Sequence, residues 1–326
     1  MNLPSFFRAS RRALLKGHIE ICRFDHWIKN IFVLPGTLVA LAFLPRPIDL
    51  HLLERFIVGL LAIGIVASSN YVINEILDAP FDRKHPLKKH RAVPSGRVNI
   101  PVAYVQWIAL MFLGLALSLY VSKSFAVVAA VLWVMGCIYN IPPLRSKDLP
   151  YLDVLSESIN NPLRMLAGWF IVDPLVFPST NLLLSYWMLG AYLMALKRFA
   201  EMRDLADGKL AADYRKSFRY YTQNNLLIST VFYASAAMLF LGAFIMRYKM
   251  ELILSFPFVA WVMALYMQLS FKKNSAVQAP EKLYREPLLM AAVALCSTVM
   301  IALFFVKIPC LEEFFAPTLP TLNALP

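Results

Sequence analysis

The feature that most constrains this chain is a series of long apolar stretches, because a bilayer span needs about 20 mostly apolar residues. We count nine such stretches, and apolar residues make up 59% of the 326 residues. This pattern predicts an all-α polytopic membrane protein with nine transmembrane helices, and it excludes a soluble enzyme. The predicted spans are 28–46, 54–77, 101–121, 124–141, 153–173, 182–203, 225–246, 251–270 and 287–306.

The excess of positive charge fits membrane insertion better than nucleic-acid binding. The formal net charge is +12, and about 24 of the 32 Lys and Arg residues fall on one side if the N-terminus is cytoplasmic. We therefore expect no nucleic-acid partner, a cytoplasmic N-terminus and an external C-terminus. The predicted cytoplasmic segments are 1–27, 78–100, 142–152, 200–224 and 271–286, with the adjoining helix ends.

The second predicted span ends in a polar stripe. Asn70, Asn74, Asp78 and Asp82 follow at intervals of four, which places them on one face of a helix. Asp78 and Asp82 can bind one divalent cation together, and Asn74 and Glu75 are near enough to help. A plain acidic helix end is the weaker interpretation, because carboxylates at a helix C-terminus oppose the macrodipole.

A strongly basic loop follows these carboxylates directly. Carboxylates that hold a hard cation, next to a run of cations, suit a polyphosphate whose charge is shared between metal and side chains. Topogenic charge facing anionic lipid would explain some of the cations but not their position beside the carboxylates. The loop residues that we expect to bind substrate are Arg83, His85, Lys88, Lys89 and Arg91.

A second basic group lies at the start of the first span, in the stretch RFDHWIKN at residues 23–30. Trp27 suits the membrane interface, and Lys29 is expected at the cytoplasmic mouth of a site. Lys29 is either a phosphate contact or part of an aromatic and cationic anchor.

The fifth predicted span carries a second polar stripe. Asp153, Glu157, Asn160, Asn161 and Arg164 recur at i, i+4, i+7, i+8 and i+11, which is one face of a helix. Burying Glu157 and Arg164 in lipid would cost several kcal/mol each, so this face must contact other helices or water. It is either an internal ion-pair network or, as we prefer, the wall of a deep cavity open to the cytoplasm.

The ends of the fourth and sixth spans bring further polar groups to the same side. Tyr139 and Lys147 flank the end of the fourth span, and Lys197, Arg198 and Glu201 lie near the end of the sixth. A solvated helix with intrahelical ion pairs is the alternative for this last group. We expect all five to contribute to the cavity mouth.

The stretch NEILDAPFD at 74–82 resembles the NDxxDxxxD signature of the UbiA superfamily of intramembrane prenyltransferases, with Glu75 in place of the usual Asp. Within it, the chain is most similar to the decaprenyl-phosphate phosphoribosyltransferase branch. Four stretches carry this similarity: RFDHWIKN at 23–30, DRKHP and KKHR within 82–91, the DVL…LR…AG pattern at 153–168, and KRxxE at 197–201. The resemblance covers most of residues 23–225, and Asn160-Asn161-Pro162 is more polar than the branch pattern.

The resemblance implies one UbiA-like transmembrane domain over residues 1–326, with an amphipathic cytoplasmic lead-in at 1–27 and an external tail at 308–326. It also implies a central cavity, a pyrophosphate donor and Mg²⁺ held at the motif. The expected metal ligands are Asn74, Glu75, Asp78 and Asp82. The expected location is a bacterial inner membrane, with the active site facing the cytoplasm; no oligomeric state is indicated.

The implied reaction is Mg²⁺-dependent transfer of a 5-phosphoribosyl group from phosphoribosyl pyrophosphate to a polyprenyl, decaprenyl-like phosphate for cell-envelope lipid biosynthesis. We expect Asn74, Asp78 and Asp82 to act on the leaving pyrophosphate, and Asp153 or Glu157 to stabilise positive charge at the anomeric carbon. The expected substrate-binding residues are Lys29, Arg83, His85, Lys88, Lys89, Arg91, Tyr139, Lys147, Asn160, Arg164, Lys197, Arg198 and Glu201.

Two other functions remain open at this stage. A conventional UbiA-type prenyltransferase, which moves an isoprenoid from its diphosphate to an aromatic or lipophilic acceptor, would use the same Mg²⁺ site. The number of basic groups favours the phosphoribosyl reaction, because its donor and acceptor bring three phosphate sites. A secondary transporter could also line its path with polar stripes, but here the polar groups gather at one end of the bundle instead of the midplane.

Overall fold

The computed structural model describes residues 11–44, 46–83, 88–205 and 215–316. All regular secondary structure in these residues is helical, which confirms the all-α prediction. The helices are α1 (Arg11–Glu20), η1 (Phe24–Val33), α2 (Leu34–Phe43), α3 (Leu50–Asp82), η2 (Lys88–His90), α4 (Ile100–Val121), α5 (Lys123–Asn140), η3 (Ser146–Asp148), α6 (Leu152–Ser158), α7 (Asn160–Val172), α8 (Thr180–Asp204), η4 (Lys216–Arg219), α10 (Gln223–Tyr248), η5 (Met250–Ser255), α11 (Phe256–Ser270), η6 (Ala276–Gln278), η7 (Pro280–Arg285), α12 (Pro287–Phe305) and α13 (Pro309–Phe314).

Seven helical segments in the described residues are long and apolar enough to cross a membrane. The predicted spans 153–173 and 182–203 are helical too, as α6 with α7 and as α8, but they do not meet this criterion. Helix α7 has only 13 residues, and α8 ends in a charged turn. The protein is therefore a polytopic helical bundle, whereas the count of nine spans is not confirmed.

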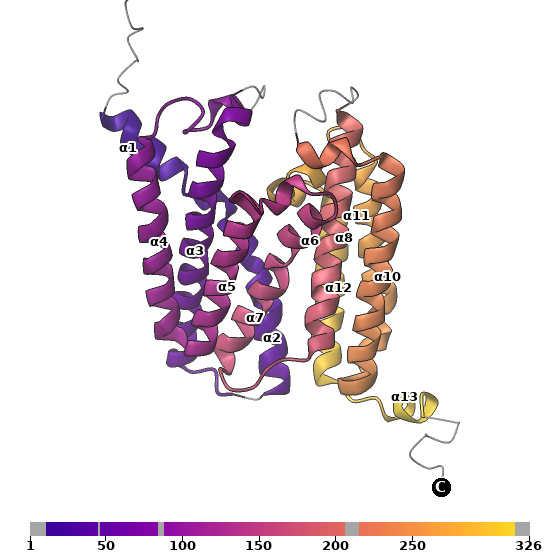
Figure 1. The fold of residues 1–326 in the computed structure, drawn as a ribbon. Coiled ribbons are helices and arrows are strands. Elements are labelled where there is room, and N and C mark those ends of the chain that lie inside the picture. The colour runs from indigo at the N-terminus through magenta and orange to yellow at the C-terminus, as the bar shows by residue number, and fades with distance from the viewer. Residues whose placement is uncertain (1–10, 45, 84–87, 206–214, 317–326) are drawn as a thin grey trace, which may run out of the picture.

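The bundle has two sides, with α6 and α7 between them (Figure 1). On one side, α3 packs along α4 and α5; on the other, α8 packs along α10. Val66, Phe125 and Ile171 belong to the apolar core of the first side. Leu196 and Ala237 belong to that of the second. The polar residues of α6 and of the first turns of α7 thus lie between these two apolar cores.

Helices α2 and α7 approach each other closely through two glycines. A Cβ atom built on Gly36 would overlap the carbonyl oxygen of Met165, and one built on Gly168 would overlap that of Val33. The Thr37 hydroxyl donates a hydrogen bond of 3.2 Å to the carbonyl of Gly168. This contact fixes the position of α7, and with it the polar residues at its N-terminal end.

The fifth predicted span is not one continuous helix, although the spacing of its polar residues predicts one. It divides at Ile159 into α6 and α7. Pro162 has no N–H to donate to the carbonyl of Ser158, which explains the interruption. As a result, Asp153 and Glu157 lie on α6, whereas Asn160, Asn161 and Arg164 lie on α7.

Candidate functional site

A cavity of about 470 Å³ lies between the two sides of the bundle, near the ends of α3 and α8. Among the described residues that line it, ten are Lys or Arg and five are Asp or Glu, which makes it a cationic cavity. The predicted site residues that line it are Lys29, Asn74, Asp78, Asp82, Lys88, Arg91, Tyr139, Lys147, Glu157, Asn160, Arg164, Lys197 and Glu201.

Asp78 is the best-connected carboxylate of the α3 stripe. Its Oδ1 atom accepts hydrogen bonds from Lys147 Nζ at 2.6 Å and from Arg145 Nη2 at 2.8 Å. Its Oδ2 atom accepts one from Asn74 Nδ2 at 3.2 Å. The Asn140 side-chain oxygen accepts from both Asn74 Nδ2 (2.5 Å) and Lys147 Nζ (2.9 Å). The network ties α3 to the end of α5 and to η3.

Asp82, one turn further along α3, is paired with the basic loop. Arg91 Nη1 donates to its Oδ2 atom at 2.7 Å, and the Asp82 side chain is buried. Lys88 also lines the cavity, and burial lowers its pKa from 10.5 to about 8. Both carboxylates of the motif therefore lie next to cations, as the sequence pattern predicts.

Glu75 does not join the other motif residues, contrary to our expectation. Its Oε1 atom accepts a hydrogen bond of 3.0 Å from the backbone N–H of Val93, and it is not among the residues that line the cavity. A residue next to Asn74 projects about 100° away around the helix, which explains this placement. Glu75 anchors the loop after α3 instead of contributing to the cation site.

Two predicted basic ligands also lie outside the cavity. Arg83 and Lys89 are exposed and are absent from its lining. Arg83 is the C-cap residue of α3, and Lys89 lies in η2. The expectation that they hold donor phosphates is therefore not supported. His85 lies outside the described residues.

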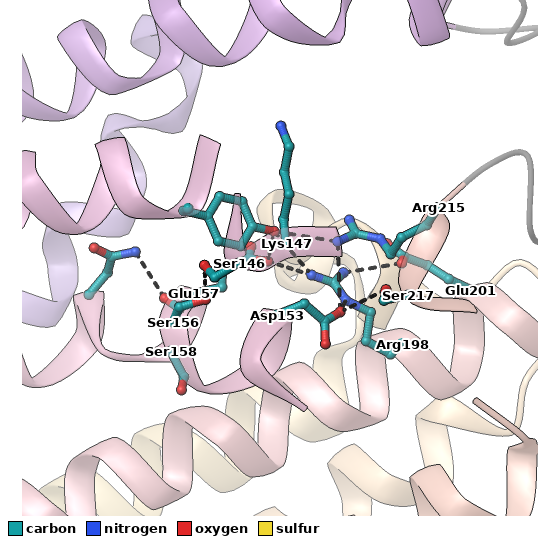
Figure 2. Close-up of polar contacts among 12 residues, drawn as sticks. Ser146, Lys147, Asp153, Ser156, Glu157, Ser158, Arg198, Glu201, Arg215 and Ser217 are labelled. Carbon is teal, nitrogen blue, oxygen red and sulfur yellow. Dashed lines mark hydrogen bonds and ion pairs between the residues drawn. The ribbon is translucent and has the colours of Figure 1, made fainter. Parts of the chain in front are cut away.

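Arg198 is the centre of a buried ion-pair network (Figure 2). Its guanidinium donates to Asp153 Oδ2 at 3.0 Å, Glu157 Oε2 at 2.5 Å and Glu201 Oε2 at 3.2 Å. The residue has no solvent exposure and does not line the cavity. The structure thus places Arg198 in the ion-pair network and outside the cavity lining, with its donors occupied by three carboxylates.

Asp153 is enclosed by the same network and cannot contact a substrate at the anomeric carbon. It has no solvent exposure. Its Oδ1 atom accepts from the Tyr221 hydroxyl at 2.6 Å, and its Oδ2 atom accepts from the Ser217 hydroxyl at 3.3 Å. Burial, reinforced by Asp153, raises the pKa of Tyr221. Asp153 therefore joins α6 to the segment that precedes α10.

Glu157 belongs to both the network and the cavity wall. It accepts a hydrogen bond of 2.9 Å from the Tyr139 hydroxyl as well as the one from Arg198. Unlike Asp153, it lines the cavity. Of the two carboxylates proposed from the α6 sequence, Glu157 is the one that a ligand can approach.

Some polar residues of the cavity were not among the predicted metal, catalytic or substrate-binding residues. They include Arg23, Asn70, Tyr71, Asn140, Arg145 and Arg215. Two signals could have found some of them: Asn70 shares the four-residue spacing of the α3 stripe, and Arg145 lies two residues before Lys147. Arg215 gives no such signal, because its position in the cavity depends on residues distant in the sequence, such as Tyr139, to whose hydroxyl it donates at 3.4 Å.

The donor set around Asp78 and Asp82 fits a magnesium ion that is shared with a polyphosphate. Within the described residues, no three His, Cys, Asp or Glu residues lie close enough to form a metal cage. Mg²⁺ is usually held by one or two carboxylates, with phosphate and water oxygens completing its octahedron. The side-chain oxygen of Asn70 lines the same cavity, is buried and has no hydrogen-bond partner in the described structure.

Comparisons with known proteins agree with this architecture. The sequence model of the UbiA prenyltransferase family matches residues 32–295. Decaprenyl-phosphate phosphoribosyltransferase from Mycobacterium tuberculosis is 28% identical over 70% of this chain and 74% of its own length. The enzyme of that name from Corynebacterium glutamicum is 29% identical over 67% and 64%, respectively. A UbiA homolog from Archaeoglobus fulgidus bound to DMAPP and Mg²⁺ superposes with a TM-score of 0.67 at 18% identity, covering 89% of this chain and 99% of that one.

Proposed function

The chain belongs to the UbiA prenyltransferase family, and from that premise we propose that this membrane transferase moves a 5-phosphoribosyl group from phosphoribosyl pyrophosphate to a decaprenyl-like polyprenyl phosphate. The observation that carries the proposal is the cation excess of the cavity, ten Lys and Arg residues against five Asp and Glu residues. Donor and acceptor together bring three phosphate sites, and each favours charge-assisted hydrogen bonds. The names of the relatives at 28% and 29% identity support the same reaction.

Asp78 and Asp82 are the proposed magnesium ligands, and the side-chain N–H₂ group of Asn74 donates to both Asp78 and the side-chain oxygen of Asn140. When bound, the metal would neutralise charge on the leaving pyrophosphate. Lys147 and Arg91 hold the two carboxylates in position. Glu75 is not part of this proposal.

The remaining cavity residues have roles that follow from their charge. Lys88, Arg91 and Lys147 are proposed to bind the donor phosphates, and Lys29 and Lys197 line the cavity with them. The acceptor phosphate is already anionic, so its attack needs no general base. Glu157, held by Tyr139 and Arg198, is proposed to stabilise the oxocarbenium-like charge at the anomeric carbon.

We also propose that residues 1–326 form one domain in a bacterial inner membrane, with the N-terminus and the cavity on the cytoplasmic side. The distribution of Lys and Arg between the predicted sides supports this orientation. In this arrangement a soluble pyrophosphate donor reaches the cavity from the compartment in which such donors are made.

A conventional prenyltransferase reaction is the second candidate, favoured by one observation. The Archaeoglobus fulgidus homolog with the same fold was solved with DMAPP and Mg²⁺. The carboxylates of α3 would serve that reaction equally well, because both reactions expel pyrophosphate.

A donor competition in nanodiscs separates the two reactions. Purified protein is given labelled phosphoribosyl pyrophosphate and polyprenyl phosphate, with Mg²⁺ or with a chelator. We expect a labelled lipid that disappears with chelator and in Asp78→Asn, but persists in Glu54→Gln, which alters an exposed acid near the opposite end of α3. Transfer from a prenyl diphosphate to an aromatic acceptor, with no phosphoribosyl product, would establish the second reaction instead.

A further inference from the structure

Two arginines of the central helices have opposite electrostatic surroundings. Arg198 on α8 faces three carboxylates. Arg164 on α7 is only 6% exposed and lines the cavity, yet in the described part of the chain it forms no ion pair with a carboxylate. The first arginine is therefore neutralised by the protein, whereas the second is not.

The surroundings of Arg164 consist of neutral groups. Its Nη1 atom donates to the backbone carbonyl of Asn160 at 3.4 Å, within its own helix. Its Nε atom is buried and has no hydrogen-bond partner in the described structure. Tyr71 and Tyr186 are its neighbours from α3 and α8. A buried guanidinium without a counter-charge costs several kcal/mol, so an anion that enters the cavity would stabilise this position.

The wall beside Arg164 offers more donors and the space for a ligand group. Asn160 and Asn161 line the cavity next to it, and the amide of Asn161 lies against Gly190. A Cβ atom at Gly190 would come within 2.5 Å of Asn161 Nδ2, so the glycine leaves room for this amide. A guanidinium fork beside an amide N–H₂ group is a typical arrangement for binding phosphate oxygens.

This end of the cavity is separate from the carboxylate end. Tyr71, which neighbours Arg164, precedes Asp78 by seven residues on α3, or about 10 Å along the helix. One phosphate group bound by Asp78 and its cations would therefore not neutralise Arg164 at the same time.

We propose that Arg164 and Asn161 form a second anion subsite, at the inner end of the cavity, that binds a phosphate monoester. The existence of the subsite follows from the uncompensated guanidinium, whereas the identity of its ligand rests on the proposed function. Two substrate groups have the required chemistry: the 5-phosphate of the donor and the phosphate of the polyprenyl acceptor.

The test measures binding and needs no turnover. Purified protein in detergent is titrated with farnesyl phosphate and farnesol, and separately with ribose 5-phosphate and ribose, so that each pair differs only in the phosphate. We expect the wild-type protein to bind at least one phosphate at least tenfold more tightly than its neutral counterpart. Arg164→Gln is expected to abolish that preference.

Arg55→Gln is the matched control. Arg55 is also an arginine of a membrane helix with a buried, unpartnered Nε atom, and it donates to the carbonyl of Phe170 at 3.0 Å, but it does not line the cavity. This variant should keep the phosphate preference. If Arg164→Gln does not fold, Arg164→Lys decides, because it keeps the charge and loses the fork; its preference should fall several-fold.

The pattern of losses identifies the ligand. Loss of the preference for farnesyl phosphate assigns the subsite to the acceptor, and loss for ribose 5-phosphate assigns it to the donor. Unchanged preferences for both in a folded Arg164 variant overturn the subsite. A protein that shows the Arg164-dependent preference but makes no phosphoribosyl lipid overturns the proposed function and leaves the subsite intact.

Discussion

Replacing Arg198 with methionine tests whether the buried network stabilises the bundle. Methionine has a similar length and fills an irregular space, so the change removes charge more than volume. It would leave Asp153, Glu157 and Glu201 without the guanidinium that now donates to all three. Arg215 would remain the nearest cation to Asp153, at 3.8 Å.

The expected cost follows from the burial of these groups. Removing one partner of a buried ion pair costs about 3–5 kcal/mol. Arg198 and Asp153 have no exposure and Glu201 has 7%, so we expect a value near the upper limit, about 5 kcal/mol. That is a large share of a typical stability of about 5–15 kcal/mol. At roughly 2–4 °C for each kcal/mol, the midpoint should fall by about 10–20 °C.

The assay is thermal unfolding in detergent, followed by tryptophan fluorescence. A compensated variant that combines Arg198→Met with Asp153→Asn and Glu157→Gln should recover part of the loss, because fewer buried charges remain unpaired. A midpoint for Arg198→Met within about 2 °C of wild type would refute the reasoning. So would a compensated variant that is less stable than the single one.

Three further predictions concern the cavity and its supports. Burial lowers the pKa of Lys88 to about 8, so its charge is present below that pH and lost above it. We therefore expect kcat/KM for the pyrophosphate donor to fall above pH 8, and this fall to move to higher pH in Lys88→Arg. An unchanged pH profile in the variant would exclude Lys88 as a donor-binding residue. Glu75→Gln keeps an acceptor for the Val93 N–H, so the Mg²⁺ concentration needed for half-maximal activity should not change; a higher requirement would return Glu75 to the metal site. Gly168→Val would press against the Val33 carbonyl and should cost about 2 kcal/mol in unfolding experiments; unchanged stability would mean that α2 can move away.

The helical architecture could be predicted because it depends on local sequence properties. Apolar length identifies a membrane helix without knowledge of its neighbours, and the four-residue spacing of Asn74, Asp78 and Asp82 fixes their common face. The polar spacing by itself predicts one continuous helix and does not reveal the break at Ile159, for which Pro162 supplies the local reason.

The pairing of charges could not be predicted in the same way. Arg164 and Arg198 both lie on polar faces of otherwise apolar segments, and both were expected to bind substrate. Their difference arises from residues distant in sequence: Asp153, a partner of Arg198, is 45 positions away. Which arginine is neutralised by the protein depends on how α6 packs against α8, and no local pattern encodes that contact.

The length of α3 has a consequence for the environment in which the enzyme works. Its 33 residues span about 50 Å, whereas the hydrocarbon core of a bilayer is about 30 Å thick. The surplus allows the end that carries Asp78 and Asp82 to lie at the depth of the lipid headgroups. A lipid substrate can then keep its chain dissolved in the bilayer throughout turnover, while only small polar molecules exchange with water. In a thicker bilayer the acidic end would be drawn toward hydrocarbon, so membrane thickness itself becomes a determinant of activity.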